Sequence, residues 1–196
     1  MILVVVFLII LLLLLLPRYK TPRVMENVLT DQERKYIISC AKDKLEDSKV
    51  TTGKIVNETI RKSKTAWLSK TDPIIKGVIE KCIRHTNKTI SECENLQVLK
   101  YESGGHYRAH QDCFDTDKNK RMYTFILALN DGYEGGETYF PTLEKRYKLK
   151  VGDALFFNTL DTHEKITPKA LHGGLHVKSG EKWICNLWVR KYPYVY

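Results

Sequence analysis

The sequence predicts a mainly β protein with supporting helices, arranged as a sandwich or jelly roll. Two observations carry this prediction. From residue 95 onward, apolar residues recur with a period of two in short runs that glycine-containing turns separate. Before residue 95, apolar residues recur at helical spacing in two segments. About eight short strands that follow two helices suit a jelly-roll core flanked by N-terminal α-helices.

The chain begins with an apolar run from Ile2 to Leu16, which Pro17 and the basic residues Arg18 and Lys20 follow. At about 1.5 Å per residue, this run approaches the ~30 Å hydrocarbon thickness of a bilayer. The basic start and the small-residue cleavage site of a signal peptide are both missing. We therefore expect residues 1–17 to form an uncleaved hydrophobic anchor helix, a signal-anchor that enters the membrane through residues 2–16, with a cleaved signal peptide as the alternative.

Two opposing signals leave open on which side of the membrane the catalytic domain lies. Basic residues after the apolar run favour a cytosolic domain. Glycosylation sequons at Asn57 and Asn87 instead suit a lumenal catalytic domain in the endoplasmic reticulum, which is the placement we expect. The net charge is +9, yet no basic run is interleaved with aromatic residues, so we expect no nucleic-acid partner.

Two helices precede the β-rich region. Thr30-Asp-Gln-Glu33 is a capping box that opens a helix to about residue 47. Asp72 and Pro73 form an N-cap and first-turn pair, and an apolar stripe continues from there through residue 85. Such stripes belong to cores, so we expect both helices to back a sheet.

The β-rich region supplies the rest of the fold. The expected organisation is an anchor over 1–17, a linker over 18–29, a helical support region over 30–92 and a catalytic domain over 93–191. The strand candidates are 96–101, 106–112, 122–129, 137–140, 147–151, 154–157, 171–177 and 183–189.

Four residues of this region indicate its chemistry. Side chains two apart on a strand face the same way, so His110 and Asp112 would share a face. A third ligand, His172, would complete the two-histidine, one-carboxylate set of non-haem Fe(II) oxygenases, which leaves metal positions open. Lys182, ten positions after His172, adds a fixed cation for an acidic cosubstrate. Taken singly, His172 is no better a ligand than His106, His163 or His176.

The sequence resembles the catalytic domain of the prolyl 4-hydroxylases, within the 2-oxoglutarate- and Fe(II)-dependent dioxygenases. The resemblance covers about residues 28–191, with weaker similarity through Arg61-Lys-Ser63. The matching stretches are Glu94-Asn-Leu-Gln-Val-Leu-Lys-Tyr101, Gly105-His-Tyr-Arg-Ala-His-Gln-Asp112, Gly135-Gly-Glu-Thr-Tyr-Phe-Pro141, Gly152-Asp-Ala-Leu-Phe-Phe157, Leu171-His-Gly-Gly174 and Gly180-Glu-Lys-Trp183.

The resemblance implies a double-stranded β-helix and a role for each matching residue. His110, Asp112 and His172 would bind Fe(II), and Lys182 would pair with the distal carboxylate of 2-oxoglutarate. Tyr101 and Thr138 would hydrogen-bond near that carboxylate. The substrate groove would be lined by Tyr107, Arg121 and Trp188. Ordinary strand packing would equally explain Tyr107 and Trp188, and a surface charge would explain Arg121.

The activity that the resemblance implies is 4-hydroxylation of prolyl residues in proline-rich or collagen-like peptides. O2, Fe(II), 2-oxoglutarate and L-ascorbate would be required, and succinate and CO2 would be released. The chain lacks the long N-terminal extension of larger collagen hydroxylases, so a monomeric catalytic unit is expected. Lysine at position 182, where many relatives of other types carry arginine, favours the collagen-type, plant-type or algal-type branch.

Some residues depart from the family pattern. His106 stands where glutamine is more usual, Leu175-His176 replaces a common Cys-Pro, and Cys113 replaces a common aromatic residue. These departures spare the iron ligands but leave the peptide preference open. Two alternatives therefore stand: a related dioxygenase that acts on another side chain, and a catalytically dead, membrane-tethered peptide-binding module. The intact metal set argues against the second.

Overall fold

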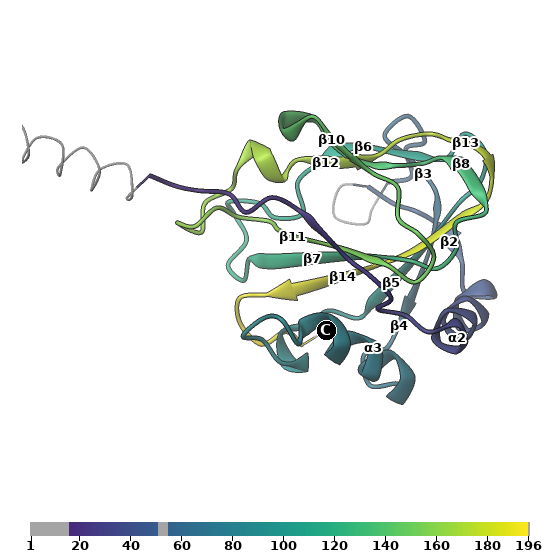
Figure 1. Ribbon diagram of the computed structural model, residues 1–196, viewed down its shortest axis with the longest axis horizontal. Helices are drawn as coiled ribbons and strands as arrows, with labels where there is room; N and C mark the ends of the chain where they lie inside the picture. The colour runs from purple at the N-terminus through teal and green to yellow at the C-terminus, as the bar shows by residue number, and fades with distance from the viewer. Residues whose placement is uncertain (1–15, 51–54, 196) are drawn as a thin grey trace, which may run out of the picture.

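The computed structural model describes residues 16–50 and 55–195, and they form two β-sheets that pack face to face (Figure 1). The larger sheet has the strand order β1-β11-β7-β14-β5-β4-β2, and the smaller has the order β10-β9-β12-β6-β3. A two-stranded sheet of β13 and β8 lies at one end. This mainly β sandwich confirms the expected architecture.

The elements have the following bounds. The larger sheet contains β1 (Arg23–Met25), β2 (Glu46–Asp47), β4 (Lys64–Leu68), β5 (Leu96–Tyr101), β7 (Arg121–Ala128), β11 (Ala154–Asn158) and β14 (Lys182–Arg190). The smaller sheet contains β3 (Arg61–Lys62), β6 (His106–His110), β9 (Thr138–Phe140), β10 (Lys145–Tyr147) and β12 (His172–Gly174). The remaining elements are β8 (Tyr133–Gly135), β13 (Val177–Gly180), the helices α2 (Asp31–Lys42) and α3 (Pro73–Ile83), and three 3-10 turns, Ile90–Glu92, Pro141–Leu143 and Pro168–Ala170.

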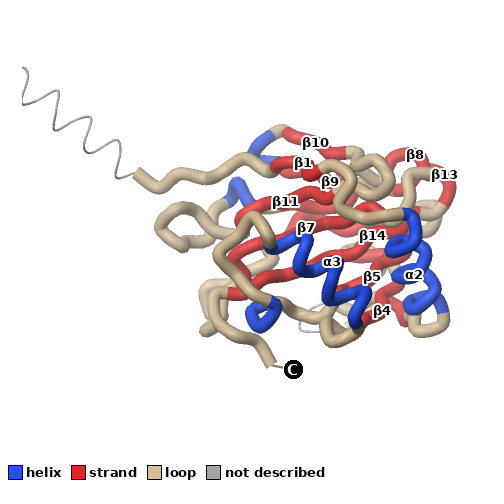
Figure 2. Tube along the Cα trace, turned by 60° about the horizontal axis from the view of Figure 1, so that its bottom comes forward, coloured by secondary structure: helices blue, strands red, loops and turns tan. Residues whose placement is uncertain are grey.

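Both helices lie across the outer face of the larger sheet, as expected (Figure 2). Thr30 and Glu33 form the reciprocal capping box that begins α2, and Asp72 accepts hydrogen bonds from two backbone amides at the start of α3. Helix α2 ends at Lys42, five residues before the predicted end. It ends early because the chain turns there into the extended pair Glu46–Asp47, which joins β4.

Because side chains alternate along a strand, the central strands contribute residues to two apolar clusters, one on each face of the larger sheet. On β14, Trp183, Cys185 and Leu187 pack with the helices, while Ile184 faces the interior between the sheets. Burial on both faces explains why these strands are almost continuous apolar runs in the sequence. The interior face nevertheless carries polar residues, and these residues mark the site described below. They are Gln97, Tyr101, Thr124, Lys182 and Asn186.

Several short strands were not predicted. β1 lies in the expected linker and pairs with β11, and β2 to β4 lie in the expected helical support region. β1, β2 and β3 have only two or three residues and show no measurable periodicity, so only pairing with a neighbour defines them. β4 has five residues, but its apolar residues Ala66, Trp67 and Leu68 are consecutive rather than alternating. The predicted strand 171–177 is in fact two strands, β12 and β13. The strand is interrupted between them, where the His176 carbonyl accepts a hydrogen bond from the Gly136 amide.

The predicted strand 147–151 lies instead at Lys145–Tyr147. The left-handed conformation of Glu144 (φ 54°) closes the turn from β9, so pairing starts directly after it. Within the described residues, no helix is long and apolar enough to cross a bilayer. The expected anchor helix over residues 1–17 falls outside the described part, apart from its last two residues. All five cysteines are free thiols.

Candidate metal centre and cosubstrate pocket

The smaller sheet brings the three predicted metal ligands together. His110 is the last residue of β6, and His172, the first residue of β12, is its partner across the strand pair. The Nε2 atoms of both histidines lie 3.6 Å from the Asp112 carboxylate, one from each oxygen. The potential ligand atoms of the three residues all lie within 4.8 Å of one another, which suits a single metal ion.

Asp112 is placed differently from the expectation. β6 ends at His110, so Asp112 lies beyond the strand and alternation alone does not align it. Its position is fixed by neighbours on β7: the Thr124 hydroxyl donates to Asp112 Oδ2 at 2.7 Å, and Arg121 Nη1 donates to the Asp112 carbonyl at 3.4 Å. The carboxylate therefore reaches the histidines through tertiary contacts.

Hydrogen bonds orient both histidine rings. His110 Nδ1 lies 2.9 Å from the Arg108 carbonyl, and His172 Nδ1 lies 3.0 Å from the Ala170 carbonyl. Because a carbonyl can only accept, each Nδ1 carries a proton, and each Nε2, on the side of the Asp112 carboxylate, is the atom that could bind a metal ion. Metal-binding histidines are typically held in this way.

The charges also suit a divalent cation. Burial lowers the pKa of His172 to about 4, although Asp112 opposes the shift, so its imidazole is neutral at pH 7. Burial alone would raise the pKa of Asp112, but the two histidines and Arg121 outweigh it and hold that pKa well below the usual range. One carboxylate and two imidazoles would leave positions open on a bound metal ion, and this ligand set is that of non-haem Fe(II) oxygenases.

Lys182 is a buried cation without a carboxylate partner among the described residues. Its side chain is 4% exposed, and Nζ donates to the Gly136 carbonyl at 2.7 Å. Burial and then the nearby charge of Lys148 lower the pKa of Lys182 to about 8, while Glu137 opposes them. A buried ammonium is costly unless an anion accompanies it, so this position is suited to a ligand carboxylate.

Lys182 and the metal ligands His110 and His172 line one cavity. Tyr101, opposite Lys182 in the β5–β14 pair, and Thr138 of β9 line it too, so the structure brings the predicted cosubstrate residues together. Five further lining residues were not among the predicted site residues: Ile126, Gly173, Gly174, Ile184 and Asn186. Asn186 could have been found from its polar side chain on an inward position of β14.

The predicted groove residues lie on two sides of the metal ligands. Tyr107 stacks on the His110 ring with centroids 3.7 Å apart and also lines the cavity. On the other side, the Arg121 guanidinium lies 3.7 Å from the centre of the Trp188 ring. Arg121 is held by two hydrogen bonds to Glu94, at 2.6 and 2.9 Å, a buried partner that was not predicted from the sequence.

Two departures from the family pattern are neighbours. The rings of His106 and His176 stack with centroids 4.3 Å apart. His106 begins β6 and His176 follows β12, so the pair continues the same strand pairing that joins His110 to His172.

A jelly roll with this ligand set defines a non-haem Fe(II) oxygenase, and comparisons with known proteins agree. The family model of the 2OG-Fe(II) oxygenase superfamily matches residues 96–190. A protein of Acanthamoeba polyphaga mimivirus, named "Putative prolyl 4-hydroxylase", is 37% identical over 184 residues, which cover 88% of this chain and 75% of the viral protein. Prolyl 4-hydroxylase 1 of Arabidopsis thaliana is 31% identical, with coverage of 86% and 68%.

A solved structure is similar over the same region. The viral collagen prolyl hydroxylase of Paramecium bursaria Chlorella virus-1, solved in complex with 2-oxoglutarate, superposes with a TM-score of 0.72 at 31% identity. The match covers 88% of this chain and 97% of that one. The present chain belongs to the prolyl 4-hydroxylase family of 2-oxoglutarate- and Fe(II)-dependent dioxygenases.

Proposed function

We propose that this enzyme hydroxylates prolyl residues at the 4-position in proline-rich or collagen-like peptides and converts 2-oxoglutarate to succinate and CO2. The observation that carries the proposal is the cavity in which Lys182 lies together with the metal site. Such a cavity has a place for each end of a dicarboxylic cosubstrate. Relatives named prolyl 4-hydroxylases support the choice of proline.

We assign His110, Asp112 and His172 as the ligands of Fe(II). The iron would supply the activation of O2 and the oxidation of an unactivated C–H bond. The protein holds the His172 imidazole neutral and the carboxylate ionised, and Thr124 keeps that carboxylate in place. With three protein ligands, the ion would keep positions for 2-oxoglutarate and O2.

Lys182 is assigned to the distal carboxylate of 2-oxoglutarate, with Tyr101 and Thr138 beside it. All three side chains are buried, so the ion pair forms away from water and is correspondingly strong. Because Lys182 and the metal ligands line the same cavity, 2-oxoglutarate would bind with its distal carboxylate at the lysine and its 2-oxo acid end at the metal.

Tyr107, Arg121 and Trp188 are assigned to the peptide groove. Tyr107 covers His110 on one side of the metal site, while Arg121 and Trp188 form a stacked pair on the other. The target residue would lie between these groups, above the open face of the metal. Aromatic rings suit proline because its ring is apolar and rigid.

The decisive experiment supplies the full chain with Fe(II), ascorbate, 2-oxoglutarate, O2 and a proline-rich peptide. We expect peptide-dependent succinate release and a mass increase of one oxygen atom that fragmentation assigns to proline. A His172→Ala variant, which lacks one metal ligand, serves as the blank. Oxidation confined to another residue type would refute the prolyl assignment, and absence of turnover on a peptide library would refute the activity.

A further inference from the structure

We propose that a basic surface between the N-terminal segment and the end of α3 binds the headgroups of anionic phospholipids. This basic face is defined by five exposed residues, Arg18, Lys20, Arg23, Arg84 and His85. The inference goes beyond the proposed function, because it assigns a partner to a part of the molecule that hydroxylation does not use. Binding there would hold the folded domain against a membrane surface.

Two basic segments of the sequence supply this face. Residues 17–25 contain three arginine or lysine residues, residues 81–88 contain three more, and neither segment contains aspartate or glutamate. Summed charges of one sign create a positive potential that attracts anions and raises their local concentration. A negatively charged partner would therefore be drawn to the place where the two segments meet.

The fold places the two segments side by side. β1, which begins at Arg23, is the edge strand of the larger sheet, and Arg84 and His85 directly follow α3. Arg23 and His85 together line two cavities, of about 450 and 230 Å³. Arg84 lines the larger of them and Lys20 the smaller, so basic side chains from both segments surround the same hollows.

The cations of the basic face have few counter-charges. Its arginine and lysine side chains form no ion pair with any residue that the structure describes. Glu26 is the single carboxylate among the described residues that line the two cavities. Lys81, which lines the larger cavity too, is already bound to Glu33 at 2.6 Å. Because unpaired like charges repel one another, an anion between them would stabilise this part of the surface.

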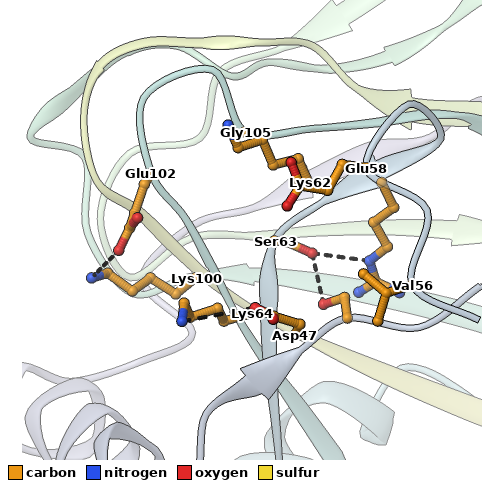
Figure 3. Close-up of a pocket in the computed structure, with 11 residues that line it drawn as sticks. Asp47, Val56, Glu58, Lys62, Ser63, Lys64, Lys100, Glu102 and Gly105 are labelled. Atoms are coloured by element: carbon orange, nitrogen blue, oxygen red, sulfur yellow. Dashed lines mark hydrogen bonds and ion pairs between the residues drawn. The ribbon is translucent and has the colours of Figure 1, made fainter.

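A further cavity, of about 140 Å³, shows the contrasting arrangement (Figure 3). Lysines and carboxylates line it together and pair across it. Lys100 lies 2.9 Å from Glu102, and Lys64 lies 3.8 Å from Asp47. Cations without carboxylate partners thus distinguish the basic face from this cavity.

Apolar residues beside the basic face favour a membrane over a soluble anion. Leu16 and Val24 are 52% and 42% exposed, and the sequence from Ile2 to Leu16 is apolar throughout. A membrane surface offers charged headgroups next to hydrocarbon, so it suits both kinds of side chain. Anionic lipids are abundant in the cytoplasmic leaflet, so this inference agrees with the basic residues after the apolar run rather than with the sequons.

The two arginines of the segments suit a phosphate ligand. A guanidinium presents a planar fork of donors that matches two phosphate oxygens at once. The Arg23 guanidinium is also held in place, because it lies 5.1 Å from the centre of the Phe156 ring. A donor that is already ordered loses less entropy when it binds. Arg23 and Arg84 are therefore the residues to replace in a test.

The basic face leaves the catalytic cavity accessible. The described residues that line its two cavities include none of those that line the cavity of Lys182 and the metal ligands. A membrane-bound enzyme could therefore still take up 2-oxoglutarate and peptide. Variants of the basic face should accordingly keep the Fe(II) affinity and the turnover of the wild type in solution.

The test measures how the full chain partitions onto neutral phosphatidylcholine vesicles and onto vesicles that are about a third phosphatidylserine. The apolar N-terminal sequence contributes to both, so the ratio of the two partition coefficients isolates the effect of charge. Arg23→Gln combined with Arg84→Gln should lower this ratio about 25-fold, since each basic residue near the surface contributes about 5-fold. High salt should lower the ratio of the wild type as well.

The matched control combines Lys44→Gln with Lys178→Gln. These exposed lysines follow α2 and lie on β13, outside both cavities, and their loss changes the net charge equally. The ratio should stay close to that of the wild type. If the thermal midpoint shows that the double arginine variant does not fold, Arg84→Gln alone, at an exposed position after α3, should still lower the ratio about 5-fold.

Hydrogen exchange gives a local measurement on the wild type. Backbone amides of residues 18–25 and 84–88 should exchange more slowly on anionic vesicles than on neutral ones, whereas those of residues 42–47 should not change. Equal exchange of the two basic segments on both kinds of vesicle would overturn the inference, even if the chain binds both through its apolar sequence.

The remaining outcomes separate the membrane from other partners. An equal ratio for the basic-face variant and its control would overturn the inference and show that net charge alone attracts the vesicles. Tighter binding to double-stranded DNA than to anionic vesicles, lost in the arginine variant, would overturn it in favour of nucleic acid. Stabilisation by inorganic phosphate without any preference for anionic vesicles would overturn it in favour of a soluble anion. None of these results depends on prolyl hydroxylation.

Discussion

Thr124 and Asp112 are joined by a 2.7 Å hydrogen bond between two buried side chains, the hydroxyl of one and Oδ2 of the other. We predict that Thr124→Val, which keeps the shape and removes the donor, weakens Fe(II) binding about 10- to 100-fold. Titration with Fe(II) under anaerobic conditions measures the change. Thr71→Val, an exposed threonine far from the metal site, is the control. An unaltered Fe(II) affinity would mean that the hydroxyl does not orient the carboxylate.

Lys182→Ala should raise the KM for 2-oxoglutarate and spare Fe(II) binding. A charge-assisted hydrogen bond is worth about 1.5–3 kcal/mol, which corresponds to roughly a 10- to 150-fold change. Steady-state kinetics and a metal titration separate the two effects. Arg190, another basic residue of β14, is bound instead to Glu94 at 2.8 Å. An unchanged KM for 2-oxoglutarate would show that Lys182 is not the cosubstrate cation.

The affinity for 2-oxoglutarate should depend on pH. Burial, followed by the charge of Lys148, lowers the pKa of Lys182 to about 8, so the free enzyme carries the ammonium below this pH and loses it above. The KM for 2-oxoglutarate should therefore be flat below this pKa and rise about tenfold per pH unit above it. Lys148→Gln removes the like charge, raises the pKa of Lys182 and should move the rise to higher pH. A KM that stays constant well above the pKa of Lys182 would contradict this.

Glu94 should stabilise both the fold and the peptide groove. Its side chain is 3% exposed and binds Arg121 and Arg190. Glu94→Gln leaves two arginines without their counter-charge, so we expect a loss of about 3 kcal/mol in the free energy of unfolding, measured by urea denaturation. Because Arg121 supports Trp188, the KM for peptide should rise more than the KM for 2-oxoglutarate. Equal changes in both constants would indicate general destabilisation only.

The two glycines after His172 should respond differently to alanine. A Cβ at Gly173 would lie 2.7 Å from Tyr139 Cε1 and 2.8 Å from the Tyr107 carbonyl, so β6 and β12 would have to move apart. A Cβ at Gly174 would meet only the Tyr107 amide nitrogen, at 3.8 Å. We predict that Gly173→Ala lowers the thermal midpoint and weakens metal binding, whereas Gly174→Ala changes the midpoint little. The reverse order would contradict the close pairing of β6 with β12.

The central strands and both helices could be predicted because their signals are local. A capping box began α2, and an eight-residue strand such as β7 showed its period without knowledge of its neighbours. β3 was missed because a strand of two residues is defined only by its pairing with β6. β4 was missed because its apolar residues Ala66, Trp67 and Leu68 are consecutive and show no alternation.

The metal ligands could be predicted because their order and spacing are distinctive, although their alignment depends on contacts outside β6. No spacing rule connects Glu94 to Arg121, which is 27 residues away and meets it only through the fold. Partners of this kind require a three-dimensional structure. The polar side chain of Asn186 on an inward position was the one local signal that could have extended the site.

A single residue, Ser63, separates β3 in the smaller sheet from β4 in the larger one. Arg61 on β3 and Trp67 on β4 line the same hollow. Beside this hollow, the chain itself connects the two sheets through Ser63. At this point the two sheets cannot separate freely. Any increase in the distance between them requires changes in the backbone torsion angles of the few residues around Ser63. The separation of the two sheets at this edge is therefore set by a covalent link through Ser63 as well as by side-chain packing.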